Sequence, residues 1–203
     1  MSTALEELAR TASTCTRCRL SAGRTQVVFA DGSPDADLMF IGEGPGYHED
    51  QKGIPFVGAA GQLLNTLLGE IGLERSEVRI TNTVLCRPPG NRDPLPDELE
   101  SCRPYLTQQV ELVDPKVIVT LGNFATRVIL DTKMGITRVR GQRFPWNGRV
   151  VIPTFHPAAV LRGGGATSKT MQQVRDDFTT VRAVLEESRE SVVLLPEEQL
   201  GLF

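Results

Sequence analysis

The four cysteines of this chain fall into one tight pair and one loose pair, and no other feature constrains the fold as strongly. Cys15 and Cys18 have two residues between them, whereas Cys86 and Cys102 lie far downstream with fifteen residues between them. Clustered cysteines in a chain without a secretory signal are typical of metal or iron–sulfur sites. We therefore predict a four-thiolate site that ties the N-terminal segment to the middle of the fold.

The spacing leaves the identity of the bound group open. A zinc ribbon uses two short cysteine pairs, which the gap of fifteen residues does not match. Four thiolates also suit a 4Fe-4S cluster. Spacing alone favours zinc and iron–sulfur equally, with free thiols as a third alternative.

The composition is that of one globular domain. The chain has 203 residues, of which 40% are hydrophobic, enough to fill a core. It has no apolar run near about 18 residues and no secretory signal, so we expect a cytosolic protein that does not cross a membrane. The formal net charge of -3 argues against a surface covered in phosphate-binding charge, but it permits a local basic face.

Short apolar runs alternate with helical patterns along the chain. The strands that we expect are 37–42, 78–84, 116–122 and 150–154. Alternating strands and helices produce a parallel sheet with helices on both faces. The sequence thus predicts an α/β fold, a single-domain three-layer α/β/α arrangement around a mostly parallel four-stranded sheet, covering residues 1–190.

The expected helices are 5–11, 61–69, 97–113 and 169–190. Asn123 is placed as the N-cap of a further helix that ends at Leu130. Asn147 and Gly148 stand between two apolar stretches, which predicts a β-hairpin turn.

Candidate site residues follow the expected strands at their carboxyl ends. These residues are Gly42 and Glu43, Asn82, Gly122, and His156. Open α/β sheets bind their ligands at this edge. Four separate loops are therefore predicted to form one site.

The glycine loop Gly42-Glu43-Gly44-Pro45-Gly46 does not match a dinucleotide-binding fingerprint. Its third glycine comes one place early, the proline interrupts it, and no helix opens directly behind it. A P-loop lysine is also missing. Nicotinamide and nucleotide triphosphate binding are disfavoured, although the glycines still allow backbone to pass close to a ligand.

Four side chains have the chemistry of a base-binding site, and each has a structural alternative. Phe56 is either a core residue or a stacking platform. Asn82 presents a donor and an acceptor side by side, which suits the edge of a base, but asparagines at strand ends also bond loops. A lone histidine is more often structural, although His156 at the sheet edge could stabilise a developing anion. Arg162 could hold a phosphate.

The segment 136–150 combines basic and aromatic residues without any acid. It is the best candidate for a nucleic-acid contact, with a solvated hairpin as the alternative. Its relevant residues are Arg138, Arg140, Arg143, Phe144, Trp146 and Arg149.

From Cys15 to about Phe178, these motifs in their order resemble the iron–sulfur (family 4) uracil-DNA glycosylases. The motifs are Cys15-Thr-Arg-Cys18, Gly42-Glu-Gly-Pro-Gly46 with Glu49-Asp50, Pro55-Phe-Val-Gly58, Thr81-Asn-Thr83, Cys86-Arg-Pro-Pro89 through Cys102, and His156-Pro-Ala-Ala-Val-Leu-Arg162. The resemblance implies that the cysteines hold a 4Fe-4S cluster with a structural role.

The resemblance also implies a reaction, the hydrolysis of the N-glycosidic bond between uracil and deoxyribose after the base has flipped out of the DNA. Phe56 would then stack on uracil, and Asn82 would read the edge that distinguishes uracil from cytosine. His156 would donate to O2 and stabilise the leaving anion.

Further roles follow from the same resemblance. Gly42, Glu43 and the backbone around Gly44 would contact the ring and the attacking water. Glu49 would crowd C5 and help to reject thymine, and Arg162 would grip DNA beside the lesion.

This chain departs from the best-known uracil glycosylases, because Gly44 stands where they have an aspartate general base. We therefore expect leaving-group stabilisation to outweigh proton abstraction. Some relatives trap DNA through a histidine on an arginine-rich insert. The only other histidine here is His48, in the glycine loop, so we expect turnover. A cluster-bearing nucleic-acid-binding module without chemistry is the rival interpretation.

Residues 191–203 are expected to be a flexible tail. Gln199-Leu-Gly-Leu-Phe203 resembles the pentapeptide by which bacterial repair proteins dock on the replication sliding clamp. The alternative is an apolar segment folded back on the domain. We thus expect a monomer, cytoplasmic and nucleoid-associated, whose partners are uracil-containing DNA (single- or double-stranded) and the clamp.

Overall fold

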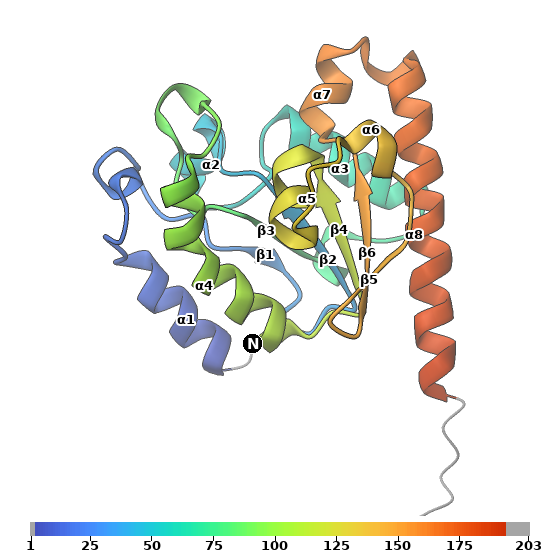
Figure 1. Cartoon of the computed structure of the whole chain (residues 1–203), viewed down its shortest axis with the longest axis horizontal. Helices are drawn as coiled ribbons and strands as arrows, with labels where there is room; N and C mark the ends of the chain where they lie inside the picture. The colour runs from blue at the N-terminus through green and yellow to red at the C-terminus, as the bar shows by residue number, and fades with distance from the viewer. Residues whose placement is uncertain (1–2, 194–203) are drawn as a thin grey trace, which may run out of the picture.

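The computed structural model describes residues 3–193, and at its centre is a sheet with the strand order β1-β3-β2-β4-β6-β5 (Figure 1). The strands are β1 (Asp31–Gly32), β2 (Leu38–Gly42), β3 (Arg79–Asn82), β4 (Val117–Leu121), β5 (Phe144–Trp146) and β6 (Arg149–Thr154).

The four central strands run parallel, as the sequence predicted, but the sheet has six strands where four were expected. Both additional strands are antiparallel edges. β5 forms a hairpin with β6, and the φ angles of Asn147 (47°) and Gly148 (77°) are both left-handed, as a tight hairpin turn requires. β1 pairs with β3 over only two residues, which is too short to give a recognisable sequence pattern.

Helices cover both faces of the sheet. The α-helices are α1 (Thr3–Ser13), α2 (Tyr47–Lys52), α3 (Ala59–Glu70), α4 (Pro96–Val113), α5 (Gly122–Leu130), α6 (Ile136–Val139), α7 (Pro157–Arg162) and α8 (Lys169–Val193). The 3-10 turns are η1 (Arg19–Ala22), η2 (Arg75–Glu77), η3 (Pro89–Asn91) and η4 (Gly165–Thr167). Helix α8 continues past the expected boundary at residue 190, and the proposed clamp motif lies outside the described residues. Within the described range, no helix is both long and apolar enough to cross a bilayer.

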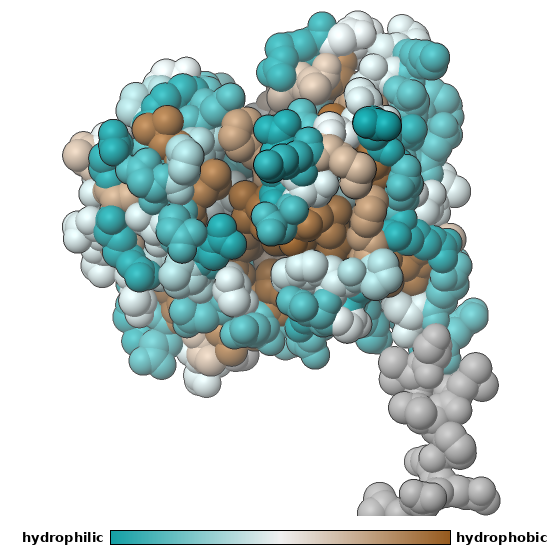
Figure 2. Space-filling model, in the orientation of Figure 1, coloured by the Kyte–Doolittle hydropathy of each residue, from teal (hydrophilic) through white to brown (hydrophobic). Residues whose placement is uncertain are grey.

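The alternation of side chains along β2 builds the two cores of the three-layer fold. Leu38 and Phe40 point to the face that α3 and α8 cover, whereas Met39 and Ile41 point to the face that α4 and α5 cover. Phe40 is fully buried and stacks on Phe178 of α8 with ring centroids 5.7 Å apart. Burying such a ring contributes about 2–3 kcal/mol. In Figure 2, apolar side chains gather between α4 and α8, while polar ones cover the outside of α8.

A third, smaller apolar cluster lies where α1 packs against α4. It contains Leu8, Ala12 and Leu20 together with Val84, Leu85 and Tyr105, and it includes or contacts the four cysteines. The N-terminal segment therefore packs on the middle of the chain beside the cysteines, and the four-thiolate site stays a prediction.

Two local expectations were wrong. A helix does open directly behind the glycine loop, because α2 begins at Tyr47 with Gly46 as its N-cap. Asn123 is not an N-cap, because α5 begins one residue earlier, at Gly122. Its side-chain Oδ1 instead accepts a hydrogen bond from the Ile136 backbone N–H at 2.8 Å, which joins α5 to α6.

Three of the four arginines in the basic segment 136–150 pair with acidic residues. Arg140 pairs with Asp177, Arg143 with Glu187, and Arg149 with Asp114. The turn at 147–148 precedes β6, so it lies at the end of the sheet opposite the strand ends expected to bind the ligand. These pairs join the hairpin and α6 to the neighbouring helices. Arg138 on α6 is exposed, and the interpretation of the segment as a nucleic-acid contact stays a prediction.

Candidate active site

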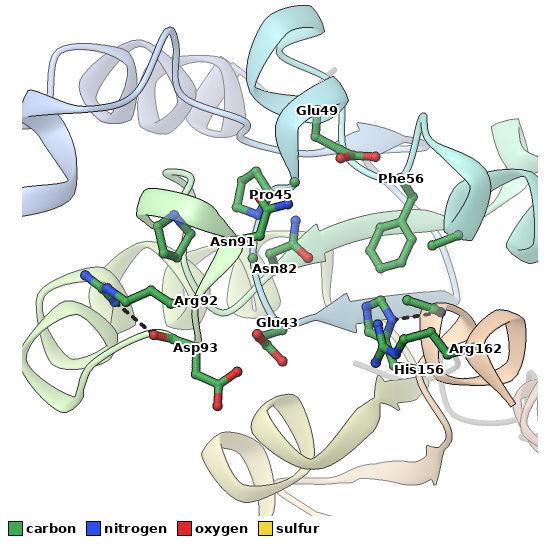
Figure 3. Close-up of a pocket in the computed structure, with 15 residues that line it drawn as sticks. Glu43, Pro45, Glu49, Phe56, Asn82, Asn91, Arg92, Asp93, His156 and Arg162 are labelled. Carbon is green, nitrogen blue, oxygen red and sulfur yellow. Dashed lines mark hydrogen bonds between the residues drawn. The ribbon is translucent and has the colours of Figure 1, made fainter.

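A cavity of about 350 Å³ lies at the carboxyl ends of the parallel strands β2, β3 and β6. In Figure 3, side chains from the loops behind these strands face this common space. The lining residues are Glu43, Gly44, Pro45, Gly46, Glu49, Phe56, Ala60, Asn82, Pro88, Asn91, Arg92, Asp93, His156, Ala158 and Arg162. The edge that the sequence selected therefore carries a cavity.

Gly42 supports this cavity without lining it. A Cβ atom at Gly42 would lie 2.4 Å from Asn82 Oδ1 and 2.6 Å from the Phe56 ring. Only glycine leaves room for these two side chains to meet over the end of β2. Gly44 is similarly confined, because its Cβ would lie 2.7 Å from the Val84 side chain.

Asn82 is the last residue of β3 and is buried, with 1% of its surface exposed. Its side-chain Oδ1 is buried and has no hydrogen-bond partner among the described residues. An unpaired buried acceptor costs about 1–3 kcal/mol. Asn82 therefore holds an acceptor ready for an N–H donor that enters the cavity.

His156 is the N-cap of α7, and its tautomer is fixed by the backbone. The Ala158 N–H donates to His156 Nδ1 at 3.2 Å (Figure 3). Burial, together with the positive charge of Arg162, lowers the pKa of His156 to about 4. The imidazole is thus neutral at pH 7, and its single proton sits on Nε2, which is left as a donor.

Glu43 follows β2 directly, and its main-chain carbonyl accepts hydrogen bonds from Val84 N and Thr83 Oγ1. Burial, together with the like charge of the nearby Asp93, raises the pKa of its carboxyl to about 7 against the opposing effect of Arg162. A carboxyl with this pKa exchanges protons near neutral pH, as general acids and bases in active sites do.

Phe56 presents its ring to the cavity from a strained backbone with φ of 53°. The ring stacks on the His156 imidazole with centroids 5.6 Å apart and an angle of 30° between the planes. Glu49 Oε1 accepts hydrogen bonds from the N–H groups of Val57 and Gly58, both at 2.9 Å. Glu49 therefore lines the cavity and also holds the loop that carries Phe56.

Sequence reasoning missed one wall of the cavity, the loop with Pro88, Asn91, Arg92 and Asp93. A charge-assisted pair between Arg92 and the fully buried Glu98 at the start of α4 fixes this loop, with distances of 2.6 and 2.8 Å. The proline-rich sequence of this loop, between Cys86 and Cys102, was the feature from which a rigid cavity wall could have been predicted. His48, by contrast, is exposed, touches Tyr47 and does not line the cavity.

The four cysteines form no disulfide. Cys86 and Cys102 are buried in one group of apolar side chains, and the partly buried Cys15 and Cys18 pack against this group. Arg24 Nη1 donates to Cys86 Sγ at 3.3 Å, and the Leu85 N–H donates to Cys102 Sγ at 3.3 Å. Burial raises the pKa of the Cys102 thiol to about 12. Within residues 3–193, no three His, Cys, Asp or Glu side chains are arranged to hold a metal ion.

The protein has an α/β fold with a cavity at the carboxyl edge of its sheet, lined by an aromatic ring, an amide and an imidazole. Residues 29–179 match the uracil DNA glycosylase superfamily. The chain is 48% identical to the type-4 uracil-DNA glycosylase of Sulfurisphaera tokodaii, over 77% of this chain and 76% of that protein. It is 49% identical to the type-4 uracil-DNA glycosylase of Thermotoga maritima, over 73% and 78% respectively. The protein therefore belongs to the type-4 family of the uracil-DNA glycosylase superfamily.

Proposed function

We propose that this protein is a DNA repair glycosylase that hydrolyses the N-glycosidic bond of uracil in DNA. It releases free uracil and leaves an abasic site, the first step of base excision repair. The observation that carries this proposal is the buried, unpaired Oδ1 of Asn82 in one cavity with the neutral His156 donor.

Uracil fits the polar groups of the cavity. Its N3–H can donate to Asn82 Oδ1, which has no partner in the described part of the chain. Its O4 can accept a hydrogen bond from the NH₂ group of the same amide. Cytosine carries an acceptor at N3 and a donor at C4, so both contacts become repulsive. Phe56 supplies the stacking surface, and the flipped base is read without contact to its former partner strand.

His156 stabilises the leaving group. As the bond between C1′ and N1 breaks, negative charge develops on the uracil ring, and the Nε2–H donates to O2. A neutral donor suits this role because a single preorganised hydrogen bond to a developing anion contributes about 3–4 kcal/mol. The proton need not leave His156, since uracil departs as an anion.

Glu43 orients the water that attacks C1′, together with the backbone around Gly44. Its pKa of about 7 makes it ionised above neutral pH, where it accepts a proton from the water as the oxocarbenium-like sugar is captured. Arg162, at the end of α7 on the cavity wall, is placed to hold a phosphate beside the lesion.

The test is to incubate the protein with a uracil-containing oligonucleotide and to treat the product with alkali. Strand scission at the uracil and free uracil in the supernatant are expected, with the same oligonucleotide containing cytosine as the control. Tight binding without base release would favour the non-catalytic module and refute the enzyme.

We further propose that Cys15, Cys18, Cys86 and Cys102 hold a 4Fe-4S cluster, which when bound cross-links the N-terminal segment to the loop behind Asn82. This proposal is supported by the packing of Cys15 and Cys18 against the apolar cluster that contains Cys86 and Cys102, and four thiolates are the usual ligands of a 4Fe-4S cluster. The N–H groups of Arg24 and Leu85 stabilise the charge of the thiolates. Iron and sulfide assays should find four of each per chain, and Cys86→Ala should lose both iron and fold; a zinc protein would contradict this.

The C-terminal residues 191–203 carry our proposal for a partner, the bacterial sliding clamp, which Gln199–Phe203 would bind as apolar anchors on a tether. Deleting these five residues should abolish clamp binding and leave uracil release from short DNA intact. Undiminished clamp binding would refute the motif.

We also propose that the protein acts as a monomer in the cytoplasm, associated with the nucleoid where its DNA substrate lies.

A further inference from the structure

The loop that presents Phe56 is held from behind by an arginine that does not line the cavity. Arg75 is the first residue of η2. Its guanidinium donates to the carbonyl oxygen of Pro55 at 2.6 Å and to that of Phe56 at 3.3 Å. Arg75 thus bonds directly to the backbone of the residue that carries the stacking ring.

Two other side chains orient this guanidinium. Asp31 on β1 accepts from Nε at 2.6 Å, and Asn65 on α3 accepts from Nη1 at 3.2 Å. Arg75 therefore joins the loop to the edge of the sheet and to the helix that follows the loop. Arg75 makes four hydrogen bonds from its rigid planar guanidinium, whereas the ammonium of a lysine has only three donors.

Phe56 requires this support because its backbone is strained. A bulky residue with φ near 53° is rare, and such residues persist only where the surroundings fix them. Helix α3 packs directly on the same peptide group, since a Cβ atom at Gly61 would lie 1.7 Å from the Phe56 carbonyl oxygen.

The loop from Pro55 to Gly58 is held by an anionic side chain through its N–H groups and by a cationic side chain through its carbonyl groups. The N–H groups of Val57 and Gly58 donate to the Glu49 carboxylate, while the carbonyls of Pro55 and Phe56 accept from the Arg75 guanidinium. An anion and a cation therefore fix four successive residues, and the Phe56 ring projects between them into the cavity.

We propose that Arg75 is a positioning residue for base stacking, which fixes the ring of Phe56 at the height at which a flipped pyrimidine meets Asn82 and His156. This inference rests on the proposed function, because it assigns Arg75 a role in that reaction. Without Arg75, the strained peptide relaxes and the ring shifts. A shift of about 1 Å in a reacting pair costs on the order of 100-fold in rate.

The test compares Arg75→Gln with a matched control, Arg175→Gln. Arg175 also makes a two-bonded pair, with Glu70 at 2.9 and 2.8 Å, but this pair joins α8 to the far end of α3. We expect Arg75→Gln to lower kcat/KM for uracil release by about 10- to 100-fold. The Arg175→Gln enzyme should stay within about twofold of the wild type. Equal effects of the two substitutions would overturn the proposal.

A double-mutant cycle separates positioning from a general structural role. In a Phe56→Ala background, Arg75→Gln should lower kcat/KM by less than about threefold, because no ring is left to position. Independent, multiplying losses would overturn the proposal. If Arg75→Gln does not fold, the same cycle is made with Arg75→Lys, which keeps the charge and is judged by the same outcomes. A wild type that releases no uracil refutes the proposed function, whereas an active wild type with an unaffected Arg75 variant refutes only this inference.

Discussion

Glu43 and Asp177 are both carboxyl groups whose pKa burial raises, but their surroundings differ. Asp177 on α8 accepts hydrogen bonds from Thr154 at 2.6 Å and from Arg140 at 2.6 and 3.0 Å, so both of its oxygens have partners within the chain although burial still raises its pKa. Glu43 has no hydrogen bond to its carboxylate among the described residues and feels the like charge of Asp93. Both lie just beyond or beside the end of a parallel strand.

The comparison separates structural polar groups from functional ones. The group around Asp177 ties α6 and α8 to the end of β6, and every partner is supplied by the chain itself. At the cavity, Glu43 and the Asn82 Oδ1 are left without partners, and His156 keeps a free donor. An unpaired buried group destabilises a fold. Among the described residues, unpaired buried atoms also occur in Arg79, Gln109 and Arg149, none of which lines the cavity, so Asn82 differs from them by its position on the cavity wall.

The largest effect is expected at His156. The substitution His156→Ser removes the donor to the leaving group and should lower the single-turnover rate of uracil release by about 10²- to 10³-fold. The melting temperature should change little, because the side chain bonds only the local Ala158 N–H. Glu43→Ala is the comparison, and it should lose less activity; an equal or greater loss would contradict leaving-group stabilisation as the main contribution.

Arg140→Met tests the paired side of the comparison. It leaves Asp177 buried without its cation, and we expect about 3 kcal/mol of lost stability in urea unfolding. The rate of uracil release per folded molecule should remain near that of the wild type. Arg143→Met, which breaks an exposed pair with Glu187, is the control and should cost about 0–1 kcal/mol. A large rate loss in folded Arg140→Met would erase the distinction between the two regions.

Asn82→Ala should behave in the opposite way. Removing the base-reading amide should lower kcat/KM for uracil by about 10²-fold. Stability should stay within about 1 kcal/mol, because the lost packing is offset by removal of an unpaired buried oxygen. Unfolding curves and uracil release, measured on the same preparation of Asn82→Ala, test whether activity is lost without a matching loss of stability. A stability loss as large as that of Arg140→Met would show that Asn82 is structural.

The smallest effect is expected from Glu43→Gln, and it depends on pH. Because folding raises the pKa of Glu43 from 4.5 to about 7, the folded state binds the proton more tightly than the unfolded state. This contribution to stability is full below pH 4.5 and is lost as the pH rises towards 7. At pH 8 we expect Glu43→Gln to be more stable than the wild type by about 1 kcal/mol after solvent screening.

His156 contributes with the opposite sign. Its folded pKa of about 4 lies below the ordinary 6.5, so its stabilising contribution is present above pH 6.5 and is lost as the pH falls towards 4.

Uracil release by the wild type should rise through pH 7 as Glu43 ionises, and the Glu43→Gln profile should be flat there. A wild-type profile without a step near pH 7 would contradict the role of Glu43.

Local patterns predicted the parts of the fold that depend on neighbours in sequence. Buried parallel strands are continuous apolar runs, so β2, β4 and β6 were found, and Asn147-Gly148 identified the hairpin. β1 was missed because two residues carry no pattern. Asn123 was misassigned because the residue preceding it already begins the helix, and its amide serves a contact thirteen residues away.

The site was predicted in outline for the same reason. In a parallel sheet, all carboxyl ends meet at one edge, so Glu43, Asn82 and His156 had to be close once the strands were known. The sequence did not reveal how the arginines of 136–150 pair, because a run of one charge does not indicate partners such as Asp177 and Asp114 that lie elsewhere in the chain.

The sequence by itself determined the layers, the sheet edge at which the cavity lies, and a resemblance that the family match confirms. Only the tertiary structure decided which polar groups are satisfied and which are not. It showed that Asn82 keeps an unpaired acceptor, that a backbone N–H fixes the tautomer of His156, and that Arg75 supports Phe56. Hydrogen bonding and desolvation depend on groups brought together from distant segments, and these distances exist only after folding.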